Sequence, residues 1–459
     1  MRSPLRTLGS LVAVALLALT AGCSKPSANL AQPTEWTRAV PAAYGRPLDS
    51  RIAEGTVLVT TTNGLIGMDP KTGAQRWWRD FAKDFDDSLG GEMSRGVAMF
   101  ALTIAGDAIV VTKSAENTPG DTGRSGHEVL DLATGQTRFT VLPKVDSADG
   151  WSFVHVTKTS IIDFQCVDLV ECDITSLPLD GGAPQWTVNL PGGRVDLPDQ
   201  LSWNQERGYS SDGNSPPIWR VATEPEFALV NNHKTDTATT VDLDTGRILG
   251  EWKHAETRAW YVLVGPTVVE VGGGDTIRGL DPATGEERWN HVPLAAASAP
   301  FGYHGLLVDG GVLIDETESD SGVKRYQFVD LLTGPQGEPL TATRPNALVV
   351  RPELVITVDE LLSEVTATDP ASGQPLWTGT LPNGDGAYRL FESVLTEDTL
   401  VITATTGFDD PGALHAVDTA TGRVRTWEGQ WILGTGDGMI IAVSGDEYEG
   451  EFALHSHWL

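Results

Sequence analysis

The sequence predicts an all-β fold built from many copies of one strand meander. Three observations lead to this prediction: a turn motif that recurs along the chain, strand-length apolar runs beside the turns, and an aromatic residue at a nearly fixed distance after most turns. Repetition on this scale means that one supersecondary unit is used many times.

The turn motif has the pattern Asp-x-x-Thr/Ser-Gly. Its copies occupy residues 69–73, 131–135, 242–246, 281–285, 330–334, 369–373 and 418–422. A degenerate eighth copy, here called the worn copy, has the sequence Pro-Leu-Asp-Gly-Gly at residues 178–182. The Asp side chain can cap the turn, the Thr or Ser hydroxyl supports the same local hydrogen bonding, and the Gly supplies the positive φ that a Cβ would disfavour. Each copy is therefore expected to be a tight turn next to a strand.

The copy at residues 281–285 illustrates what each repeat builds. Residues 267–271 are apolar and β-branched, and residues 272–275 have the composition of a turn. In residues 276–280 the side-chain character alternates as the chain approaches the motif, and residues 286–289 follow the motif as a further strand. This order of strand, turn, strand, turn and strand predicts an antiparallel meander.

An aromatic residue follows most copies about eight residues after the motif Asp. These residues are Trp77, Phe139, Trp289 and Trp377, with Trp186 in the worn copy and Trp252 and Trp427 one or two residues late. An aromatic side chain on an outer strand can pack across the neighbouring unit and bury a large area. The copy at 330–334 has Glu338 at this place, so we expect a looser junction there.

A radial stack of these units explains how their apolar faces are buried. A four-stranded unit has two such faces and cannot bury both alone, whereas the stacked blades of a β-propeller bury them. The motif glycines recur 39 to 64 residues apart, and the shorter spacings match the roughly 40 to 50 residues of a four-stranded blade. A linear solenoid would normally need polar capping repeats, which we do not find. The sequence therefore predicts a β-propeller of four-stranded antiparallel blades.

The number of blades is left open by the sequence. Eight motif copies favour eight blades, with seven or nine as alternatives. Residues 439–443 and 451–455 predict two further strands without the motif, and residues 34–37 resemble an outer strand with its Trp. Joining the N- and C-terminal strands in one sheet would close the ring and remove exposed edges. This closing sheet would either complete the eighth blade or form a ninth.

The extended pattern Asp-x-x-Thr-Gly-x-x-x-Trp resembles that of the pyrroloquinoline-quinone-type (PQQ-like) repeat propellers. The resemblance spans residues 32–459. That family includes quinoprotein dehydrogenases and also non-enzymatic lipoproteins such as the BamB-type outer-membrane assembly factors. The resemblance thus implies the fold. It does not decide between an enzyme and a non-enzyme, because proteins of both kinds have this repeat pattern.

The N-terminus predicts a bacterial lipoprotein signal over residues 1–22. Arg2 and Arg6 precede an apolar run at 11–19, and a Leu-Thr-Ala-Gly-Cys sequence then resembles a lipobox that ends at Cys23. We expect Cys23 to carry the lipid, including palmitate, since the apolar run is too short for a permanent membrane helix.

This signal sets the expected domain order and location. Residues 23–33 would form a lipidated polar tether, and residues 34–459 a single propeller domain. Plain secretion with cleavage after Ala21 is the alternative. We expect a head anchored by lipid to the cell membrane and facing outside the cytoplasm.

Charge and cysteine content agree with that location. The formal net charge of −30 argues against nucleic acid as a partner and against a head that lies on anionic lipid. With Cys23 assigned to lipid, Cys166 and Cys172 remain, and an even remainder outside the cytoplasm predicts one disulfide.

The sequence offers little support for a catalytic site. The family resemblance raises the possibility of a quinone-dependent dehydrogenase, which would hold quinone and Ca²⁺ in its channel and often has a disulfide between adjacent cysteines. Cys166 and Cys172 are six residues apart, and no cofactor-clamping residues can be matched. The motif aspartates already have a structural task. We therefore expect no catalytic residue and no cofactor.

Acidic insertions and a histidine pair are the candidate metal ligands. The acidic residues are Asp80, Asp84, Asp86 and Asp87 in one insertion, and Asp315, Glu316, Glu318 and Asp320 in another. Neither insertion has EF-hand spacing, so solvated hairpin tips are the preferred interpretation. His455 and His457 alternate on the last strand and would share one face. Ordinary packing is preferred there, and no metal is expected.

A long insertion at residues 191–217 is the candidate interaction loop. It contains Trp203 and Tyr209, and Trp219 lies just beyond it. Aromatic residues in loops on a rigid scaffold can anchor a partner, but they can equally pack the loop onto a blade.

Together these observations favour a non-enzymatic, membrane-anchored propeller. Its head is expected to be monomeric and to bind another envelope or membrane protein as an interaction scaffold. Binding of a small molecule, sugar or metal in the central channel is the alternative, and a quinone-dependent dehydrogenase is a further one.

Overall fold

The computed structural model describes most of the chain from residue 34 onwards. The described ranges are 34–81, 100–114, 125–141, 150–167, 171–192, 194–196, 218–221, 227–232, 234–253, 260–264, 266–271, 277–291, 306–308, 311–315, 324–330, 333–335, 340–342, 346–351, 354–359, 361–369, 372–382, 389–396, 398–405, 411–446 and 451–459. Glu35–Leu459 forms one compact unit. Within the described ranges, no helix has the length and apolar character needed to cross a membrane.

The described residues form nine β-sheets, and the one named helix is a short 3-10 turn, η1 (Ala42–Tyr44). The early sheets are β2 (Pro47–Ala53), β3 (Thr56–Thr61), β4 (Gly64–Met68) and β5 (Gln75–Asp80); β6 (Phe100–Ala105), β7 (Ala108–Ser114), β8 (Ser125–Asp131) and β9 (Thr137–Val141), joined by β15 (Ile218–Val221); and β10 (Gly150–Val156), β11 (Ser160–Val167), β12 (Glu171–Pro178) and β13 (Trp186–Pro191). The middle sheets are β14 (Arg194–Asp196), β16 (Phe227–Asn232), β17 (Thr237–Asp242) and β18 (Ile248–Lys253); β19 (Trp260–Val264), β20 (Thr267–Val271), β21 (Ile277–Leu280) and β22 (Glu287–His291); and β23 (Leu306–Val308), β24 (Gly311–Asp315), β25 (Lys324–Asp330), β26 (Gly334–Pro335) and β27 (Leu340–Ala342). The late sheets are β28 (Asn346–Arg351), β29 (Leu354–Val358), β30 (Glu364–Thr368) and β31 (Pro375–Thr380); β32 (Arg389–Leu395), β33 (Thr399–Thr405), β34 (Pro411–Asp418) and β35 (Val424–Glu428); and β36 (Trp431–Gly436), β37 (Met439–Asp446) and β38 (Glu451–Trp458) with β1 (Thr37–Val40).

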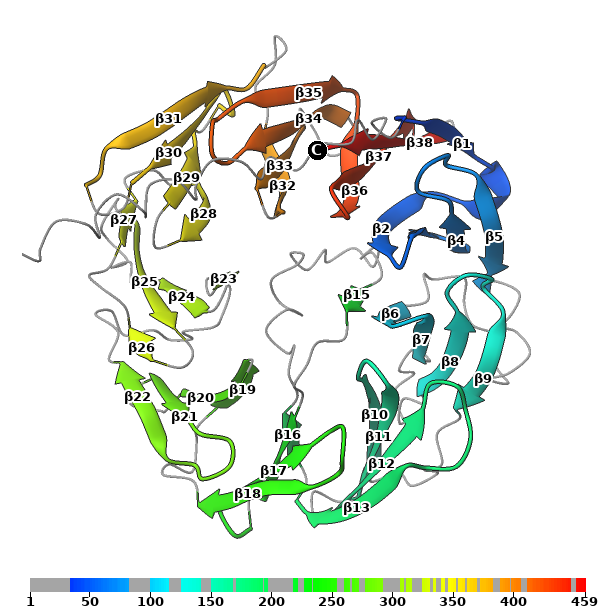
Figure 1. Cartoon of the computed structure of the whole chain (residues 1–459), viewed down its shortest axis with the longest axis vertical. Helices are drawn as coiled ribbons and strands as arrows, with labels where there is room; N and C mark the ends of the chain where they lie inside the picture. Colours follow the sequence, from blue (N-terminus) through cyan, green and yellow to red (C-terminus); the bar gives the residue numbers. More distant parts are fainter. Residues whose placement is uncertain are drawn as a thin grey trace, which may run out of the picture. The chain divides into compact units, whose positions relative to one another are not determined.

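The predicted all-β fold of four-stranded antiparallel meanders is confirmed. Consecutive strands such as β28 to β31 pair antiparallel in chain order (Figure 1). The Asp-x-x-Thr/Ser-Gly turn joins the third strand to the outer strand, as between β4 and β5.

The first and last strands of the described chain share one sheet. β1 pairs antiparallel with β38, with Thr37 opposite His455 and Val40 opposite Phe452 (Figure 1). The described residues thus contain nine sheets, one more than the eight that the motif count favoured. The reason is that β36, β37, β38 and β1 form a sheet of their own instead of completing the sheet β32–β35. Its third and outer strands come from opposite ends of the chain, so no motif turn marks it.

The motif Asp organises each turn through its side chain, as expected. In the first copy, one Asp69 oxygen accepts hydrogen bonds from the Lys71 amide, the Thr72 amide and the Thr72 hydroxyl, each at 3.0 Å. The other oxygen accepts from the Arg76 guanidinium at 2.7 Å. Gly73 closes the turn with φ +65°, in the left-handed region that favours glycine.

The aromatic side chains pack across neighbouring sheets, as predicted. Trp77 of β5 lies on the turn that ends at Gly135, and its Nε1–H donates to the Leu132 carbonyl at 3.1 Å. A Cβ at Gly135 would lie only 2.6 Å from the indole, so a glycine is needed there. Among the described residues, the aromatic and turn glycine pairs are Trp36 with Gly73, Trp77 with Gly135, Phe139 with Gly181, Trp186 with Gly246, Trp252 with Gly285, Trp289 with Gly334, and Trp377 with Gly422.

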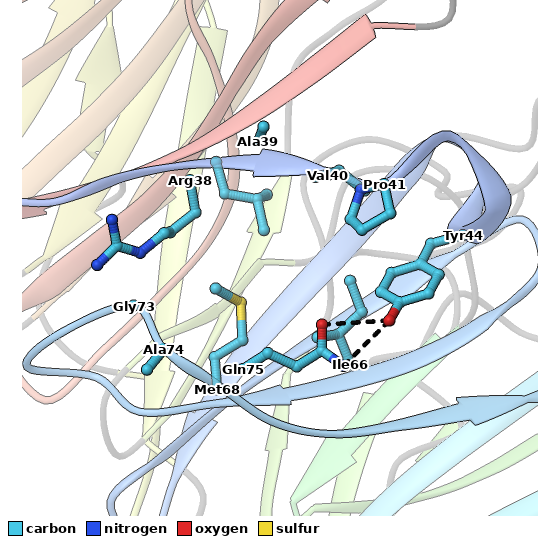
Figure 2. Close-up of a pocket in the computed structure, with 11 residues that line it drawn as sticks. Arg38, Ala39, Val40, Pro41, Tyr44, Ile66, Met68, Gly73, Ala74 and Gln75 are labelled. Atoms are coloured by element: carbon cyan, nitrogen blue, oxygen red, sulfur yellow. Dashed lines mark hydrogen bonds between the residues drawn. The ribbon is translucent and has the colours of Figure 1, made fainter.

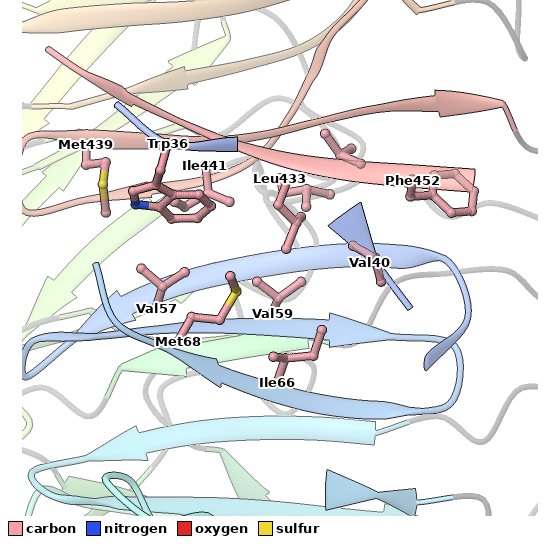
Figure 3. Packing of buried hydrophobic residues seen from close by; sticks show 12 residues of the cluster. Trp36, Val40, Val57, Val59, Ile66, Met68, Leu433, Met439, Ile441 and Phe452 are labelled. Atoms are coloured by element: carbon pink, nitrogen blue, oxygen red, sulfur yellow. The ribbon is translucent and has the colours of Figure 1, made fainter. Parts of the chain in front are cut away.

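Buried aliphatic side chains fill the space between adjacent sheets. At the seam where the chain ends meet, Val57 and Met68 of the first motif-bearing sheet pack in one cluster with Leu433 and Ile441 of the last sheet (Figure 3). Full burial of a side chain of this size contributes about 1.5–3 kcal/mol. The seam therefore holds the two ends of the chain together by core packing as well as by the β1–β38 ladder.

The long insertion after β13 contributes two strands instead of a simple loop. β14 pairs antiparallel with β16 of its own sheet, whereas β15 pairs in parallel with β6 of another sheet. Ile218 is opposite Ala101, and Val221 is opposite Ile104. Trp219 thus lies in a strand rather than in a loop.

Candidate functional site

A pocket lies between β1 and the turn that joins β4 to β5; we call it the β1–β5 pocket. Its volume is about 150 Å³, and Figure 2 shows residues 38–44 on one side of it and residues 66–75 on the other. The lining residues are Arg38, Ala39, Val40, Pro41, Tyr44, Ile66, Met68, Gly73, Ala74, Gln75 and Leu454.

The floor of the β1–β5 pocket is apolar. The side chains of Val40, Ile66, Met68 and Leu454 are all buried. They lie on β1, β4 and β38, so the floor exists only because the two ends of the chain meet. An apolar floor of this size favours an aliphatic or aromatic group over a charged one.

The rim of the pocket is polar and ordered by hydrogen bonds. Arg38 donates to the Thr72 carbonyl at 2.7 Å, so its guanidinium stands at one side. At the other side the Tyr44 hydroxyl and the Gln75 side chain are within hydrogen-bond distance, at 3.0–3.2 Å. Tyr44 also stacks on Trp78, with ring centroids 3.9 Å apart. The pocket thus combines an apolar floor with a hydrogen-bonded polar rim.

The two C-terminal histidines lie on one face, as their alternation predicted. Their rings are nearly parallel, with centroids 6.3 Å apart. His455 bonds the Thr37 hydroxyl at 3.1 Å and the Ser444 hydroxyl at 2.7 Å. These partners lie on β1 and β37, so His455 ties three strands together.

His457 also has structural partners. Its Nε2 lies 2.7 Å from the Gln430 amide oxygen, its Nδ1 lies 3.5 Å from the Glu35 carboxylate, and its ring stacks on Trp427. Burial lowers the pKa of His457, and the nearby Glu35 carboxylate partly opposes that shift. Among the described residues, no group of three or more His, Cys, Asp or Glu side chains is placed to hold a metal ion.

Buried carboxylates are held by arginines of the same or the neighbouring sheet. Glu128 of β8 accepts from Arg79 of β5 at 2.8 Å and also from the Thr137 hydroxyl. This pair links two sheets. Glu270 accepts from Tyr261 at 3.0 Å and from Arg278 in its own sheet.

The motif aspartates have the structural task that the sequence assigned to them. The Arg76 guanidinium holds the pKa of Asp69 at about 2, with support from Thr72 and Lys71. In the second copy, Arg138 bridges Asp131 at 2.8 Å and Asp107 at 2.9 Å and lowers the pKa of both carboxyl groups. These groups are ionised at neutral pH and engaged in ion pairs.

Cys166 and Cys172 are paired in the structure. They face each other in the β11–β12 hairpin with Cα atoms 4.1 Å apart, and both side chains are fully buried. This is a hairpin staple, as the position of the pair in the sequence suggested.

The other residues singled out from the sequence are placed only in part. Asp80 ends β5 and Asp315 ends β24. The backbone of Trp219 is described in β15. The remaining ones lie outside the described residues: Cys23, Asp84, Asp86, Asp87, Trp203, Tyr209, Glu316, Glu318 and Asp320.

The β1–β5 pocket was not found by sequence reasoning. Its floor combines residues near position 40, positions 66–68 and position 454. The resemblance of residues 34–37 to an outer strand was the single signal that these segments meet.

Repeated four-stranded sheets joined by aromatic-on-turn contacts are the features of a β-propeller, and they are distantly similar to those of the PQQ-like repeat propellers. Residues 234–428 match the family model described as outer membrane protein assembly factor BamB, which covers less than half of the chain. This match agrees with the distant BamB-type resemblance that the turn motif indicated.

Several solved structures are similar to the chain at low sequence identity. BamB from Moraxella catarrhalis is 13% identical, with 92% of this chain and 99% of that chain covered and a TM-score of 0.39. Quinohemoprotein alcohol dehydrogenase from Comamonas testosteroni is 11% identical, with 92% and 76% covered and a TM-score of 0.41. A eukaryotic initiation factor is 10% identical, with 84% and 88% covered and a TM-score of 0.47. Likeness at this level carries no functional argument, and no curated protein matches the sequence.

Proposed function

We propose that this protein is a non-enzymatic interaction scaffold of the bacterial cell envelope. The observation that carries the proposal is the match of residues 234–428 to the family model of an assembly factor. The described part of this segment folds into repeated propeller sheets. The ion pairs of Asp69, Glu128 and Glu270 support it, because they engage these carboxylates in structural tasks.

The scaffold would be held at the membrane by lipid on Cys23 and would face outside the cytoplasm. The lipobox-like sequence before Cys23 supports this location. The β1–β5 pocket supports a protein as the partner, since its apolar floor and hydrogen-bonded rim match an inserted side chain. The assembly role of BamB itself is not carried over to this chain.

Crosslinking in intact cells followed by affinity capture and mass spectrometry tests the proposal. We expect one envelope protein at near-stoichiometric yield. The matched control is Cys23→Ala, which leaves the head sequence unchanged but removes the lipid attachment point and should lower the yield sharply. Recovery of the bait alone would contradict the scaffold.

The non-enzymatic part of the proposal has its own test. The purified chain is mixed with pyrroloquinoline quinone, Ca²⁺, a panel of alcohols and sugars, and an artificial electron acceptor. We expect no reduction of the acceptor above the protein-free control. Turnover that requires both quinone and Ca²⁺ would establish a dehydrogenase instead.

A further inference from the structure

The ladder between β1 and β38 is bridged by an ionisable side chain. β1 pairs with β38 over four residues, and Thr37 lies directly opposite His455. The His455 ring contacts the Thr37 hydroxyl through Nδ1, at 3.1 Å, and the Ser444 hydroxyl of β37 through Nε2, at 2.7 Å. One imidazole therefore connects the first strand of the described chain to the last two.

A second histidine lies beside the first on the same face of β38. The side chain of His457 is 6% exposed, its ring stacks on Trp427 with centroids 4.2 Å apart, and its Nε2 lies 2.7 Å from the Gln430 amide oxygen. The rings of His455 and His457 are nearly parallel, with centroids 6.3 Å apart. Two imidazolium ions at this separation repel each other, so protonation of one ring disfavours protonation of the other.

Arg425 and Glu35 are the charged groups that act on this histidine pair among the described residues. Arg425 lies on β35 and adds a positive charge that opposes protonation of His457. Glu35 precedes β1, and its 52% exposed carboxylate lies 3.5 Å from Nδ1 of His457. From β1 and β37 the pair is faced by neutral hydroxyl groups. With both rings protonated, the two imidazolium ions and the guanidinium would therefore share one exposed carboxylate.

Burial favours the neutral form of both histidines. Desolvation lowers the pKa of His455. The pKa of His457 is lowered by burial first and by His455 and Arg425 in addition, and Glu35 opposes that shift in part. Because both pKa values lie below the ordinary value of 6.5, the stability that the neutral rings contribute is complete above pH 6.5 and is lost as the pH falls through the lowered values.

β1 is the strand whose separation exposes His455 to water at the lowest cost. It lies at the edge of its sheet, in the order β1, β38, β37 and β36, so it has one neighbour in that sheet. Its ladder with β38 contains four residue pairs, whereas the ladder of β37 with β38 contains eight. Local opening requires less free energy where fewer hydrogen bonds must break. Positive charge on His455 is therefore relieved first by opening of the β1–β38 ladder.

Contacts that do not titrate keep β1 beside the first motif-bearing sheet. Trp36 Nε1–H donates to the Pro70 carbonyl at 2.8 Å, and Arg38 donates to the Thr72 carbonyl at 2.7 Å. Trp36 and Val40 are also buried in the cluster at the seam. An indole and a guanidinium keep the same protonation state between about pH 5 and pH 8. Protonation of the histidines thus acts on the pairing with β38 and leaves these contacts in place.

We propose that the β1–β38 ladder is a pH-sensitive latch, in which protonation of His455 beside His457 raises the fraction of molecules with the ladder open. Acidification below pH 6.5 would loosen the connection between the two ends of the described chain while the other sheets stay paired. The inference goes beyond the scaffold function and does not depend on which partner the protein has.

Amide hydrogen exchange of the full chain, followed by mass spectrometry, tests the latch. Exchange is measured at pH 7.5 and pH 5.0, and the rates are converted to protection factors to remove the chemical pH dependence of exchange. We expect the protection of peptides that cover residues 37–40 to fall several-fold at pH 5.0. Peptides from the sheet β32–β35 should keep their protection, because the pKa of His415 in that sheet is about 4 and its ring is still mostly neutral at pH 5.0.

Three variants make the test specific. His455→Gln keeps a hydrogen-bonding side chain that does not titrate, so most of the pH-dependent loss at β1 should disappear. The matched control His415→Gln removes another buried histidine away from this ladder and should leave the loss at β1 unchanged. Glu35→Gln removes the carboxylate that opposes the shift of His457, so the loss at pH 5.0 should become larger.

The outcomes that would overturn the latch are distinct from one another. Unchanged protection at β1, an equal loss in His455→Gln, or an equal loss in every sheet would each contradict it. A gain in protection at pH 5.0 that Glu35→Gln abolishes would show that the Glu35–His457 contact tightens the ladder on protonation instead. Titration of the His455 ring in the native chain by NMR needs no variant: a pKa below 6.5 is expected, and a pKa above 6.5 would refute the proposal.

Discussion

Replacing Trp77 with Ala probes how adjacent sheets are held together. Trp77 is 8% exposed and lies between two glycines, Gly67 of its own sheet and Gly135 of the next turn. A Cβ on Gly67 would lie 2.1 Å from the indole, and one on Gly135 2.6 Å from it, so the ring fills the whole gap between the two backbones. The substitution therefore creates a cavity that neither glycine can close.

The expected loss follows from burial and one hydrogen bond. Truncation of a buried Trp to Ala costs about 3–5 kcal/mol. The Leu132 carbonyl loses its bond from Nε1–H, which contributes on the order of 1 kcal/mol, although water can reach the opened gap and replace it. We therefore expect the free energy of unfolding to fall by about 3–4 kcal/mol.

Guanidinium unfolding followed by far-ultraviolet circular dichroism measures this loss. The matched control is Ile248→Ala, because Ile248 is a 48% exposed aliphatic residue that also lies beside a motif turn. Its effect should stay within about 0.5 kcal/mol. A loss below about 1 kcal/mol for Trp77→Ala, or one no larger than that of the control, would refute the view that the indoles hold the sheets together.

Three further predictions concern covalent and charge interactions. Alkylation of the native chain, followed by intact mass measurement with and without reductant, should find Cys166 and Cys172 unmodified until reductant is added; two reactive thiols in the native chain would disprove the disulfide. Burial lowers the pKa of His415 to about 4 from an ordinary value near 6.5, so its contribution to stability is complete above pH 6.5 and is lost as the pH falls towards 4. His415→Gln should accordingly lose less stability than the native chain between pH 7 and pH 4.5 in chemical denaturation, and equal losses would contradict this assignment. Arg76 holds the pKa of Asp69 at about 2, so that ion pair stabilises the fold above pH 3.8 and is lost as the pH falls towards 2. Arg76→Leu should therefore be less stable than the native chain at pH 5 but not at pH 2, and a deficit that persists at pH 2 would point to lost packing instead.

Local chemistry explains why so much of the fold was readable from the sequence. The turn motif needs only an Asp, a hydroxyl and a glycine within five residues, and Asp69, Thr72 and Gly73 bond to one another as that spacing requires. Most of the aromatic contacts were predictable for the same reason, since Trp77, Trp289 and Trp377 each lie eight residues beyond a motif Asp.

Contacts between distant segments explain what was missed. The ninth sheet joins β1 to β38, and no local turn can signal a pairing between residues about 420 positions apart. The parallel pairing of β15 with β6 also has no local signature, because an insertion reaches another sheet. The candidate site was predicted least well for this reason: Val40, Met68 and Leu454 form one pocket floor only after the ends have met.

The sequence by itself determined the repeating unit, because the hydrogen bonds of its turns and the alternation of its strands act over fewer than ten residues. Only the tertiary structure decided the number of sheets among the described residues, the partner of β15 and the β1–β5 pocket. Each of these depends on which surfaces remain uncovered once the sheets pack, and that is settled by burial summed over the whole chain rather than by any local pattern.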